Sequence, residues 1–171
     1  MTVIQCLNKK EMVALVTGDA DHDALVTERN PKGDKVFRGF TYFCPEEISD
    51  PGCNKPRYLV AFAKNSSDPS DITGVLKVHE FPNGQQSHYQ GIMYIDVHRD
   101  HRRQGIATAL FGELDNILDP GEIVIGSAPS QFAQSIDLNT TIEKIMKRCQ
   151  YFSNAESYSI EKMVKKIKAS K

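Results

Sequence analysis

The stretch that decides the fold reads VHRDHRRQGIA and covers residues 97–107. A segment rich in strand-forming residues, 89–97, leads into it, and an amphipathic segment, 105–118, leads out of it. In the second segment apolar residues recur every three or four positions, the spacing of one helix face: Ile106, Leu110, Leu114 and Ile117. We therefore predict a strand, a short loop and a helix that begins where the loop ends.

The loop has the chemistry of an anion site. Arg99, Arg102 and Arg103 supply guanidinium groups, which bind phosphate through paired hydrogen bonds. Gly105 and Ala107 are small enough to let another group approach the backbone. The first N–H groups of a helix have no partner within the helix and lie at the positive end of its dipole. We therefore expect the loop and the helix start to bind a phosphorylated cofactor.

Two common nucleotide-binding patterns, G-x-x-x-x-G-K-[ST] and G-x-G-x-x-G, do not occur in the sequence. Residues 102–107 read RRQGIA and match the pattern [Q/R]-x-x-G-x-[G/A]. With the preceding strand, the following helix and a short apolar strand at 122–126, the chain resembles the GNAT superfamily of N-acetyltransferases. The resemblance covers residues 89–126 by motif and residues 36–150 by the order of elements.

The resemblance implies an α/β fold, with a mostly antiparallel central sheet flanked by helices, and acetyl-CoA as the cofactor. In this family the strand before the loop hydrogen-bonds the pantetheine arm through its backbone, at positions that correspond to Ile95 and Val97. Pantetheine would then behave as an added strand on a free backbone edge. The loop amides hold the pyrophosphate, at positions that correspond to Arg102, Arg103, Gln104, Gly105, Ile106, Ala107 and Thr108.

The implied activity is transfer of an acetyl group to a primary amine by direct attack. This reaction needs a base for the amine proton and an acid for the leaving thiolate. Asp96 lies on the strand face opposite Ile95 and Val97 and is the candidate base, directly or through water; it could equally be a carboxylate paired with an arginine. Glu80 is a second candidate of the same kind. Many family members place a tyrosine acid in a later helix, and neither alignment of that helix, on Ser130 or on Asn139, supplies one here. Tyr151 or Tyr158 could serve only if the C-terminal segment folds back.

The missing tyrosine keeps two alternatives open. One is a non-catalytic acyl-CoA-binding module of the same fold. The other is a toxin-type enzyme that acetylates the amine of a charged tRNA. Lys plus Arg number 21 against 22 Asp plus Glu, a formal net charge of -1, which argues against a nucleic-acid partner. The expected partner is an amine-bearing small molecule, peptide or protein.

Length and composition favour one domain over residues 1–171, since domains usually contain roughly 100–200 residues. The longest apolar run, 58–63, is far shorter than the roughly 20 residues of a membrane-spanning helix. The N-terminus lacks the basic and then apolar segments of a secretory signal. The sequence therefore predicts a cytoplasmic protein without membrane contact.

Neither a metal site nor a disulfide framework is expected. His98 and His101 have H-x-x-H spacing, but the neighbouring arginines would repel a metal cation. The cysteines form no CxxC pair and are expected to be free thiols in a reducing compartment, although a bridge between the second and third is conceivable: Cys6, Cys44, Cys53 and Cys149.

The N-terminal region is expected to be mostly helical. Asn8 is placed to cap a helix that Gly18 would end, and a second short helix is expected within 19–30. Further on, the sequence predicts a turn, an aromatic-rich strand and a proline-rich loop, at 31–34, 36–44 and 44–56.

Three apolar segments then predict an antiparallel meander with a tight turn at 82–84: 57–64, 72–81 and 89–97. Gly112 lies within the helix after the loop, where glycine costs about 1 kcal/mol relative to alanine, so a close neighbour is expected there.

The C-terminal third is expected to be largely helical. A stop signal at 119–121 and the strand at 122–126 precede helical patterns from residue 129, with a capping box at 140–143. A last helix at about 159–169 would present an apolar face to the core or to a second subunit, which makes a homodimer conceivable: Ile160, Met163, Val164 and Ile167.

Overall fold

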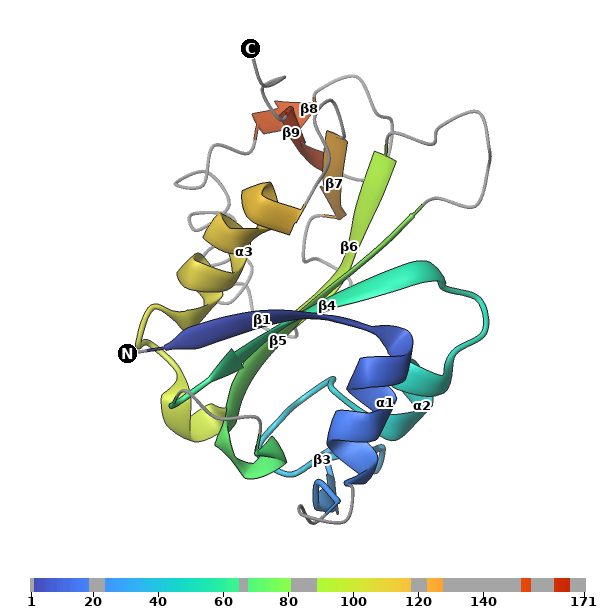
Figure 1. The fold of residues 1–171 in the computed structure, drawn as a ribbon, viewed down its shortest axis with the longest axis vertical. Helices are drawn as coiled ribbons and strands as arrows, with labels where there is room; N and C mark the ends of the chain where they lie inside the picture. The colour runs from blue at the N-terminus through green and yellow to red at the C-terminus, as the bar shows by residue number, and fades with distance from the viewer. Residues whose placement is uncertain are drawn as a thin grey trace.

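The structure is a computed structural model of the 171-residue chain. It describes residues 2–18, 24–64, 68–80, 89–117, 123–127, 152–154 and 162–166. A seven-stranded sheet in the order β1-β4-β5-β6-β7-β9-β8 forms its centre, and a two-stranded hairpin, β2-β3, lies beside it (Figure 1). Helices lie on both sides of the large sheet. The predicted α/β class is therefore confirmed.

The elements follow one another along the chain in this order: β1 (Val3–Asn8), α1 (Lys9–Thr17), β2 (Thr27–Arg29), β3 (Lys35–Phe37), α2 (Pro45–Ser49), β4 (Asn54–Phe62), the 3-10 helix η1 (Pro69–Asp71), β5 (Ile72–Glu80), β6 (Tyr89–Val97), the 3-10 helix η2 (Arg99–His101), α3 (Ile106–Ile117), β7 (Ile123–Ser127), β8 (Phe152–Asn154) and β9 (Lys162–Lys166).

The sheet is antiparallel except at one pair of strands. β4, β5 and β6 form the predicted meander, and β1 adds to the outer edge of β4. β7 then pairs with β6 in parallel, because the α3 crossover returns the chain to the same end of the sheet. β9 and β8 continue the sheet in antiparallel fashion. The mostly antiparallel sheet that the resemblance implied is confirmed.

Each face of the sheet has its own core. On one face α3 packs its apolar side against β4 and β5, and the buried residues there are Leu59, Ala61, Leu76, Val78, Ile106, Leu110, Phe111 and Leu114. On the other face α1, α2 and the segment after β3 cover the strands, with twelve buried residues that include Met12, Phe43, Tyr58, Val75 and Tyr94 (Figure 1). Burial on both faces explains why neither side of β6 is plainly polar in the sequence.

The first helix, α1, begins directly after Asn8, the residue predicted to cap it. Asn8 Oδ1 accepts a hydrogen bond from the Glu11 N–H at 3.0 Å, and Glu11 Oε2 accepts one from the Asn8 N–H at 2.8 Å. This reciprocal pair is a capping box, and it satisfies two amides that the helix leaves without partners. Gly18 ends the helix with φ 78°.

Other predictions in the N-terminal region are wrong. Val3–Asn8 is a strand rather than part of a helix, because the outer edge of β4 offers it a full antiparallel ladder. No helix forms in the described part of 19–30, where Thr27–Arg29 pairs with Lys35–Phe37 around the predicted turn at 31–34.

The predicted strand at 36–44 ends at Phe37. The chain turns after this residue, and the Phe37 N–H donates to Phe43 O at 2.9 Å. The rings of three phenylalanines pack together in the core. The ring centroid of Phe43 lies 4.5 Å from that of Phe37 and 5.2 Å from that of Phe40. The aromatic residues that suggested a strand therefore stabilise a tight turn.

The predicted loop at 44–56 contains α2 and the beginning of β4. Pro45 occupies the first turn of α2, where its missing N–H costs nothing, and Glu46 and Glu47 lie near the positive end of the helix. The fully buried Lys77 of β5 forms an ion pair with Glu47 and so holds α2 on the sheet.

The C-terminal helix predicted at about 159–169 is not formed at Lys162–Lys166, which is the strand β9. Met163 and Val164 fit a helix face or a strand over so short a window, and pairing with β7 and β8 decides between them. The homodimer therefore stays a prediction, without that helix to support it. Phe152–Asn154 is likewise a strand. The turns predicted at 82–84 and 119–121 and the helices predicted over 129–151 lie outside the described residues.

Candidate cofactor-binding site

The edge of β6 that faces β7 opens part-way along the strand. β6 and β7 pair in parallel from Tyr89 to Ile92, and β6 then continues to Val97 with no further register partner in β7. On its other side β6 stays paired with β5 as far as Val97. Among the described residues, the backbone of 93–97 thus has one edge without a strand partner. An extended ligand can add to such an edge as a strand does.

A register shift marks the point where the two strands part. Lys77 pairs with Tyr94 and Val78 pairs with Ile92, which leaves Met93 as an extra residue of β6. Such β-bulges bend a strand and increase its local twist. The bulge therefore lies beside the last β6–β7 pair, where the opening begins.

The side chains of β6 alternate as predicted. Tyr94 and Asp96 are buried, and Tyr94 belongs to the core on the α1–α2 side. Ile95 and Val97 are partly buried and pack on the α3 side. The candidate base and the two residues expected to bind pantetheine therefore lie on opposite faces of the sheet, and only their shared backbone reaches the open edge.

Asp96 holds a turn in place. Its Oδ2 accepts hydrogen bonds from the N–H groups of Thr41, Tyr42 and Phe43, at 2.8, 2.6 and 3.0 Å. Burial raises the pKa of Asp96 above its ordinary value, although the backbone donors, and after them the charge of Arg102, act in the opposite direction. Backbone amides, rather than an arginine, are thus its hydrogen-bond partners. The role of base stays a prediction, beside this structural role.

The loop after β6 is fastened to two neighbouring segments. The His98 N–H donates to Thr73 O at 2.9 Å, and the Arg99 N–H donates to Gly39 O at 2.8 Å. The His98 ring packs against Phe40, with centroids 5.3 Å apart. Because the loop is bonded to β5 and to the turn after β3, its backbone is oriented before any ligand arrives.

The three arginines of the loop have different environments. Arg99 donates from Nη2 to both carboxylate oxygens of Glu28, at 2.8 and 2.9 Å. Arg102 donates to Val97 O at 3.1 Å and to Thr41 Oγ1 at 2.9 Å. Arg103 is exposed, with φ 62°, and no carboxylate of the described residues pairs with it. Two arginines therefore stabilise the loop, and Arg103 is available to an anion.

Gly105 lies in an open position at the start of α3. It is exposed, its φ is 81°, and no described atom lies within 4 Å of the place where a Cβ would stand. The first bond of the α3 ladder runs from the Ala109 N–H to Gly105 O, at 2.9 Å. Ile106 is buried and anchors the helix start in the core. The backbone around Gly105 is therefore open, and we call this open helix start the cradle; with the exposed Arg103 beside it, it fits a diphosphate.

A glycine on β5 sets how closely α3 approaches the sheet. A Cβ on Gly74 would stand 2.8 Å from Ile106 Cγ2 and 3.2 Å from Leu110 Cδ1. The close neighbour that the sequence led us to expect at Gly112 is absent, since no described atom lies within 4 Å of a Cβ there. The close contact in this helix packing is thus made by the strand glycine.

The described residues contain no group of three side chains suited to a metal ion. The rings of His98 and His101 lie 5.5 Å apart, and burial lowers the pKa of His98 below its ordinary value. Cys6, Cys44 and Cys53 are free thiols, as predicted. Cys149 lies outside the described residues.

The sequence did not predict that residues between Glu28 and Thr41 would contact and support the loop. Glu28 contacts Arg99 across 71 residues of sequence, and Thr41 contacts Arg102 across 61. Gly39 lies under His98 and has φ 86°, and in the sequence only a glycine among aromatic residues hinted at this turn. Contacts over such separations leave no periodic pattern in a single sequence.

No protein-family model matches the chain, and no curated protein sequence matches it. Solved structures do match. A GNAT-family acetyltransferase from Streptococcus pneumoniae superposes with a TM-score of 0.55 and 16% identity, over 98% of this chain and 99% of its own. The chain has the GNAT acetyltransferase fold.

Two further structures with the GNAT fold resemble the chain. YncA from Salmonella typhimurium, solved with its cofactor acetyl-CoA, has a TM-score of 0.54 and 11% identity over 97% of this chain and 94% of its own. A variant of the spermidine N-acetyltransferase SpeG from Vibrio cholerae has a TM-score of 0.52 and 10% identity over 96% and 93%. At these identities the likeness establishes the fold, which the sequence resemblance had predicted.

No helix in the described part of the chain combines the length and apolarity that crossing a bilayer requires.

Proposed function

We propose that this chain is an acetyl-CoA-dependent N-acetyltransferase, which transfers an acetyl group to a primary amine by direct attack. The observation that carries the proposal is the free edge of β6, which runs through the fastened loop into the open cradle at Gly105. Acetyl-CoA in the Salmonella structure and the N-acetyltransferase name of the Vibrio protein support the cofactor and the acceptor class.

The proposed cofactor site uses backbone more than side chains. The backbone of Ile95 and Val97 would hydrogen-bond the amide-bearing arm at the open edge of β6. The amides of 102–108 would bind the diphosphate, with the exposed Arg103 as the charged side chain. Arg102 would keep its contacts with Val97 and Thr41 and so hold the loop in shape. Acetyl-CoA, when bound, supplies a thioester whose carbonyl carbon an amine can attack.

The protein would then have to manage two protons. The attacking amine gives up one as its C–N bond forms, and the sulfur that leaves with the C–S electron pair takes one up. Asp96, on the strand that leads into the loop, is our candidate for the first task, directly or through water. No described tyrosine is assigned to the second, and solvent can protonate a thiolate leaving group.

The amine could belong to a small molecule, a peptide or a protein, and we place the enzyme in the cytoplasm. The free thiols Cys6, Cys44 and Cys53 are in keeping with a reducing compartment.

Incubation of the full chain with acetyl-CoA and a panel of primary amines tests the proposal. We expect free thiol to appear faster than in the amine-free blank for at least one amine, with the N-acetylated product found by mass spectrometry. Calorimetry with acetyl-CoA separates the alternatives. Binding without thiol release for any amine would indicate the non-catalytic acyl-CoA-binding module. No binding at millimolar acetyl-CoA would overturn the assignment of the cofactor site.

A further inference from the structure

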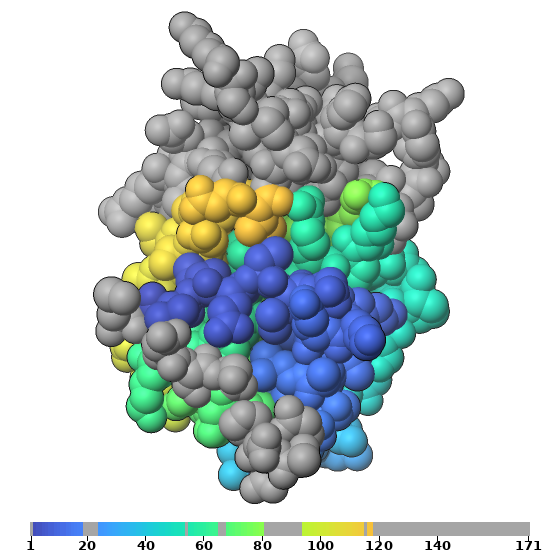
Figure 2. Space-filling model, viewed as in Figure 1, coloured from blue at the N-terminus to red at the C-terminus, as the bar shows by residue number. Residues whose placement is uncertain are grey.

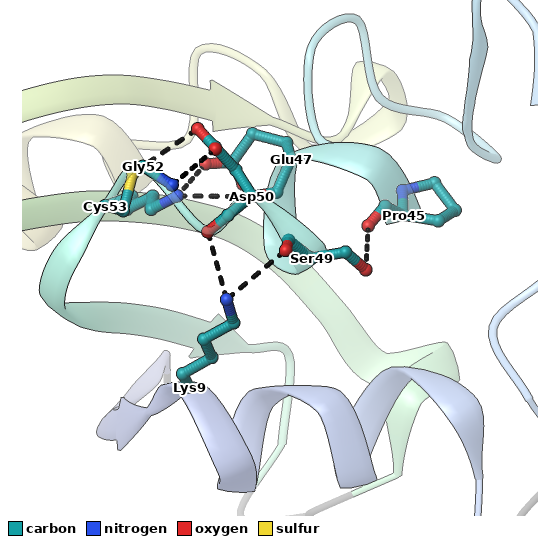
Figure 3. A network of polar contacts seen from close by, with 8 residues as sticks. Lys9, Pro45, Glu47, Ser49, Asp50, Gly52 and Cys53 are labelled. Atoms are coloured by element: carbon teal, nitrogen blue, oxygen red, sulfur yellow. Dashed lines mark hydrogen bonds and ion pairs between the residues drawn. The ribbon is translucent and has the colours of Figure 1, made fainter.

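The turn after β3, residues 38–43, is held at both ends by parts of the fold other than the cofactor loop. Before the turn, β3 pairs with β2. After it the chain enters α2, and Lys9 of α1 donates from Nζ to the carbonyl oxygens of Ser49 and Asp50 at the end of α2, at 3.3 and 3.0 Å (Figure 3). α1 packs in turn on β1 and β4, and Figure 2 shows the surfaces of these elements meeting on one face of the molecule.

The aromatic side chains of the turn give it a second anchor. Phe40 and Phe43 are buried in the core on the α1–α2 side of the sheet. The Phe40 N–H donates to Phe37 O at 3.0 Å, so the backbone of the turn is also bonded to the strand before it. Large side chains in a close-packed core have few alternative positions. The core therefore sets the position of the turn, which can serve as a fixed support for an exposed neighbour.

Thr41 connects this turn to the cofactor loop through two different groups. Its N–H donates to Asp96 Oδ2 at 2.8 Å, and its Oγ1 accepts a hydrogen bond from Arg102 Nη2 at 2.9 Å. Arg102 Nε also donates to Val97 O at 3.1 Å. Because Asp96 and Val97 are neighbours on β6, these contacts close a ring that starts and ends on this strand. The ring joins the last residue of β6 to the loop that follows it.

The ring closes on the open edge of β6. The His98 N–H and the Val97 C=O belong to one peptide group, and in a trans peptide they point in opposite directions. The His98 N–H points to Thr73 O, on β5, at 2.9 Å, so Val97 C=O points away from β5, toward the side that β7 leaves open. Arg102 therefore holds the last peptide of β6 from that side, beside the backbone proposed to bind the cofactor arm.

Arg102 depends on its partners for a fixed direction. Its side chain is exposed, whereas Thr41 is half-buried on the anchored turn. Fixing a long, exposed side chain in one geometry costs conformational entropy. Without the Thr41 hydroxyl, Arg102 would keep only its hydrogen bond to Val97 O among the described residues. A loop already held in shape avoids that ordering cost when a ligand binds.

We propose that Thr41 is a positioning residue of the cofactor site. Its hydroxyl holds Arg102 and, through Arg102, keeps the last peptide of β6 and the loop in the arrangement that binds acetyl-CoA. Thr41 acts through Arg102 and not by contact with the reacting atoms. The inference rests on the proposed function and deepens it, since it extends the site to a residue 61 positions before Arg102.

Calorimetry with acetyl-CoA on the full chain compares two substitutions of Thr41. Thr41→Val keeps the side-chain shape and the N–H bonded to Asp96 but removes the hydroxyl, and it is expected to raise the Kd for acetyl-CoA roughly three- to tenfold. Thr41→Ser restores a hydroxyl and is expected to bind within about twofold of the wild type. Thr17→Val is the matched control: it removes a hydroxyl that donates to Val13 O at 2.8 Å within α1, and the Kd should be unchanged.

A double-mutant cycle with Arg102→Met tests the path from Thr41 to the loop. We expect Thr41→Val to raise the Kd and the unfolding equilibrium constant in the wild-type background and to change neither once Arg102 is methionine. The unfolding measurements are made by chemical denaturation without acetyl-CoA. They therefore test the contact between Thr41 and Arg102 independently of the cofactor, and they check that each variant folds.

Three results would overturn the inference and leave the proposed function intact. The first is a wild-type Kd in Thr41→Val, even with a loss of stability, which would make the residue purely structural. The second is a Kd raised as much by Thr41→Ser as by Thr41→Val, which would show that the hydroxyl is not the group that matters. The third is the same effect of Thr41→Val with and without Arg102. A wild-type chain that binds no acetyl-CoA would instead overturn the proposed function and the positioning role together.

Discussion

Replacing Gly105 by alanine tests the cofactor loop directly. Gly105 has φ 81°, in the left-handed region, where an L-residue costs roughly 1–2 kcal/mol. The added methyl group would meet no described atom within 4 Å, so this strain comes without a steric clash. We therefore expect Gly105→Ala to lose about 1–2 kcal/mol of stability and to lower Tm by roughly 2–8 °C.

The larger effect is expected on binding. The methyl group would stand in the cradle and hold a diphosphate away from the backbone amides around Gly105. Losing one charge-assisted hydrogen bond costs about 1.5–3 kcal/mol. The Kd for acetyl-CoA is therefore expected to rise roughly tenfold to a hundredfold, as measured by calorimetry on the folded variant.

Gly112→Ala is the matched control on the same helix. Gly112 is exposed on α3, and no described atom lies within 4 Å of an added Cβ. Alanine is there expected to stabilise the helix by about 0.5–1 kcal/mol and to leave the Kd for acetyl-CoA unchanged. If Gly105→Ala loses stability as expected and still binds acetyl-CoA as tightly as the wild type, the placement of the diphosphate at this cradle is refuted.

Substitutions at three further positions test the elements around the loop. Asp96→Ala removes the acceptor of three backbone amides and is expected to cost roughly 1–3 kcal/mol in chemical denaturation, whereas Asp96→Asn keeps one acceptor oxygen and should cost less. If Asp96 is also the base, both variants lose kcat while the Kd for acetyl-CoA is preserved in Asp96→Asn; an unchanged kcat in Asp96→Asn would exclude that role. The Gly39 N–H and then Arg99 lower the pKa of Glu28 from 4.5, so the stability that this carboxylate contributes is present above that value and is lost as the pH falls through the folded pKa. The difference in unfolding free energy between wild type and Glu28→Gln should thus be constant near neutral pH and shrink in acid, and a difference that grows in acid would contradict the pairing. Gly74→Ala brings a Cβ to 2.8 Å from Ile106 Cγ2 and is expected to cost about 1–3 kcal/mol and to weaken acetyl-CoA binding by displacing the start of α3; a fully stable variant would argue against the close packing.

Local chemistry made parts of the fold predictable. The cap at Asn8, each strand of the meander and the apolar stripe of α3 have signals that lie within a single element, so a short window of sequence contains them. The start of α2 also had such a signal, since Pro45 and the two glutamates after it favour a helix start. The proline-rich composition of 44–56 led to the prediction of a loop there instead.

Other parts had no local signal to find. Lys162–Lys166 is too short to separate a helical from a strand period, and the ladder with β7 decides its structure. The contacts of Asp96 join residues 53 to 55 positions apart, and that of Glu28 with Arg99 spans 71. Hydrogen bonds over such separations form only when the whole sheet brings their partners together.

By itself, the sequence determined that a strand enters a basic, glycine-containing loop and that a helix starts there, because helix periodicity and the amides of a helix start are properties of neighbouring residues. The tertiary structure alone decided which arginines of the loop bind neighbouring segments, where β6 parts from β7, and that Asp96 binds the turn at 41–43. The physical reason is that pairing and burial act between segments distant in the chain, whose contacts no short pattern encodes.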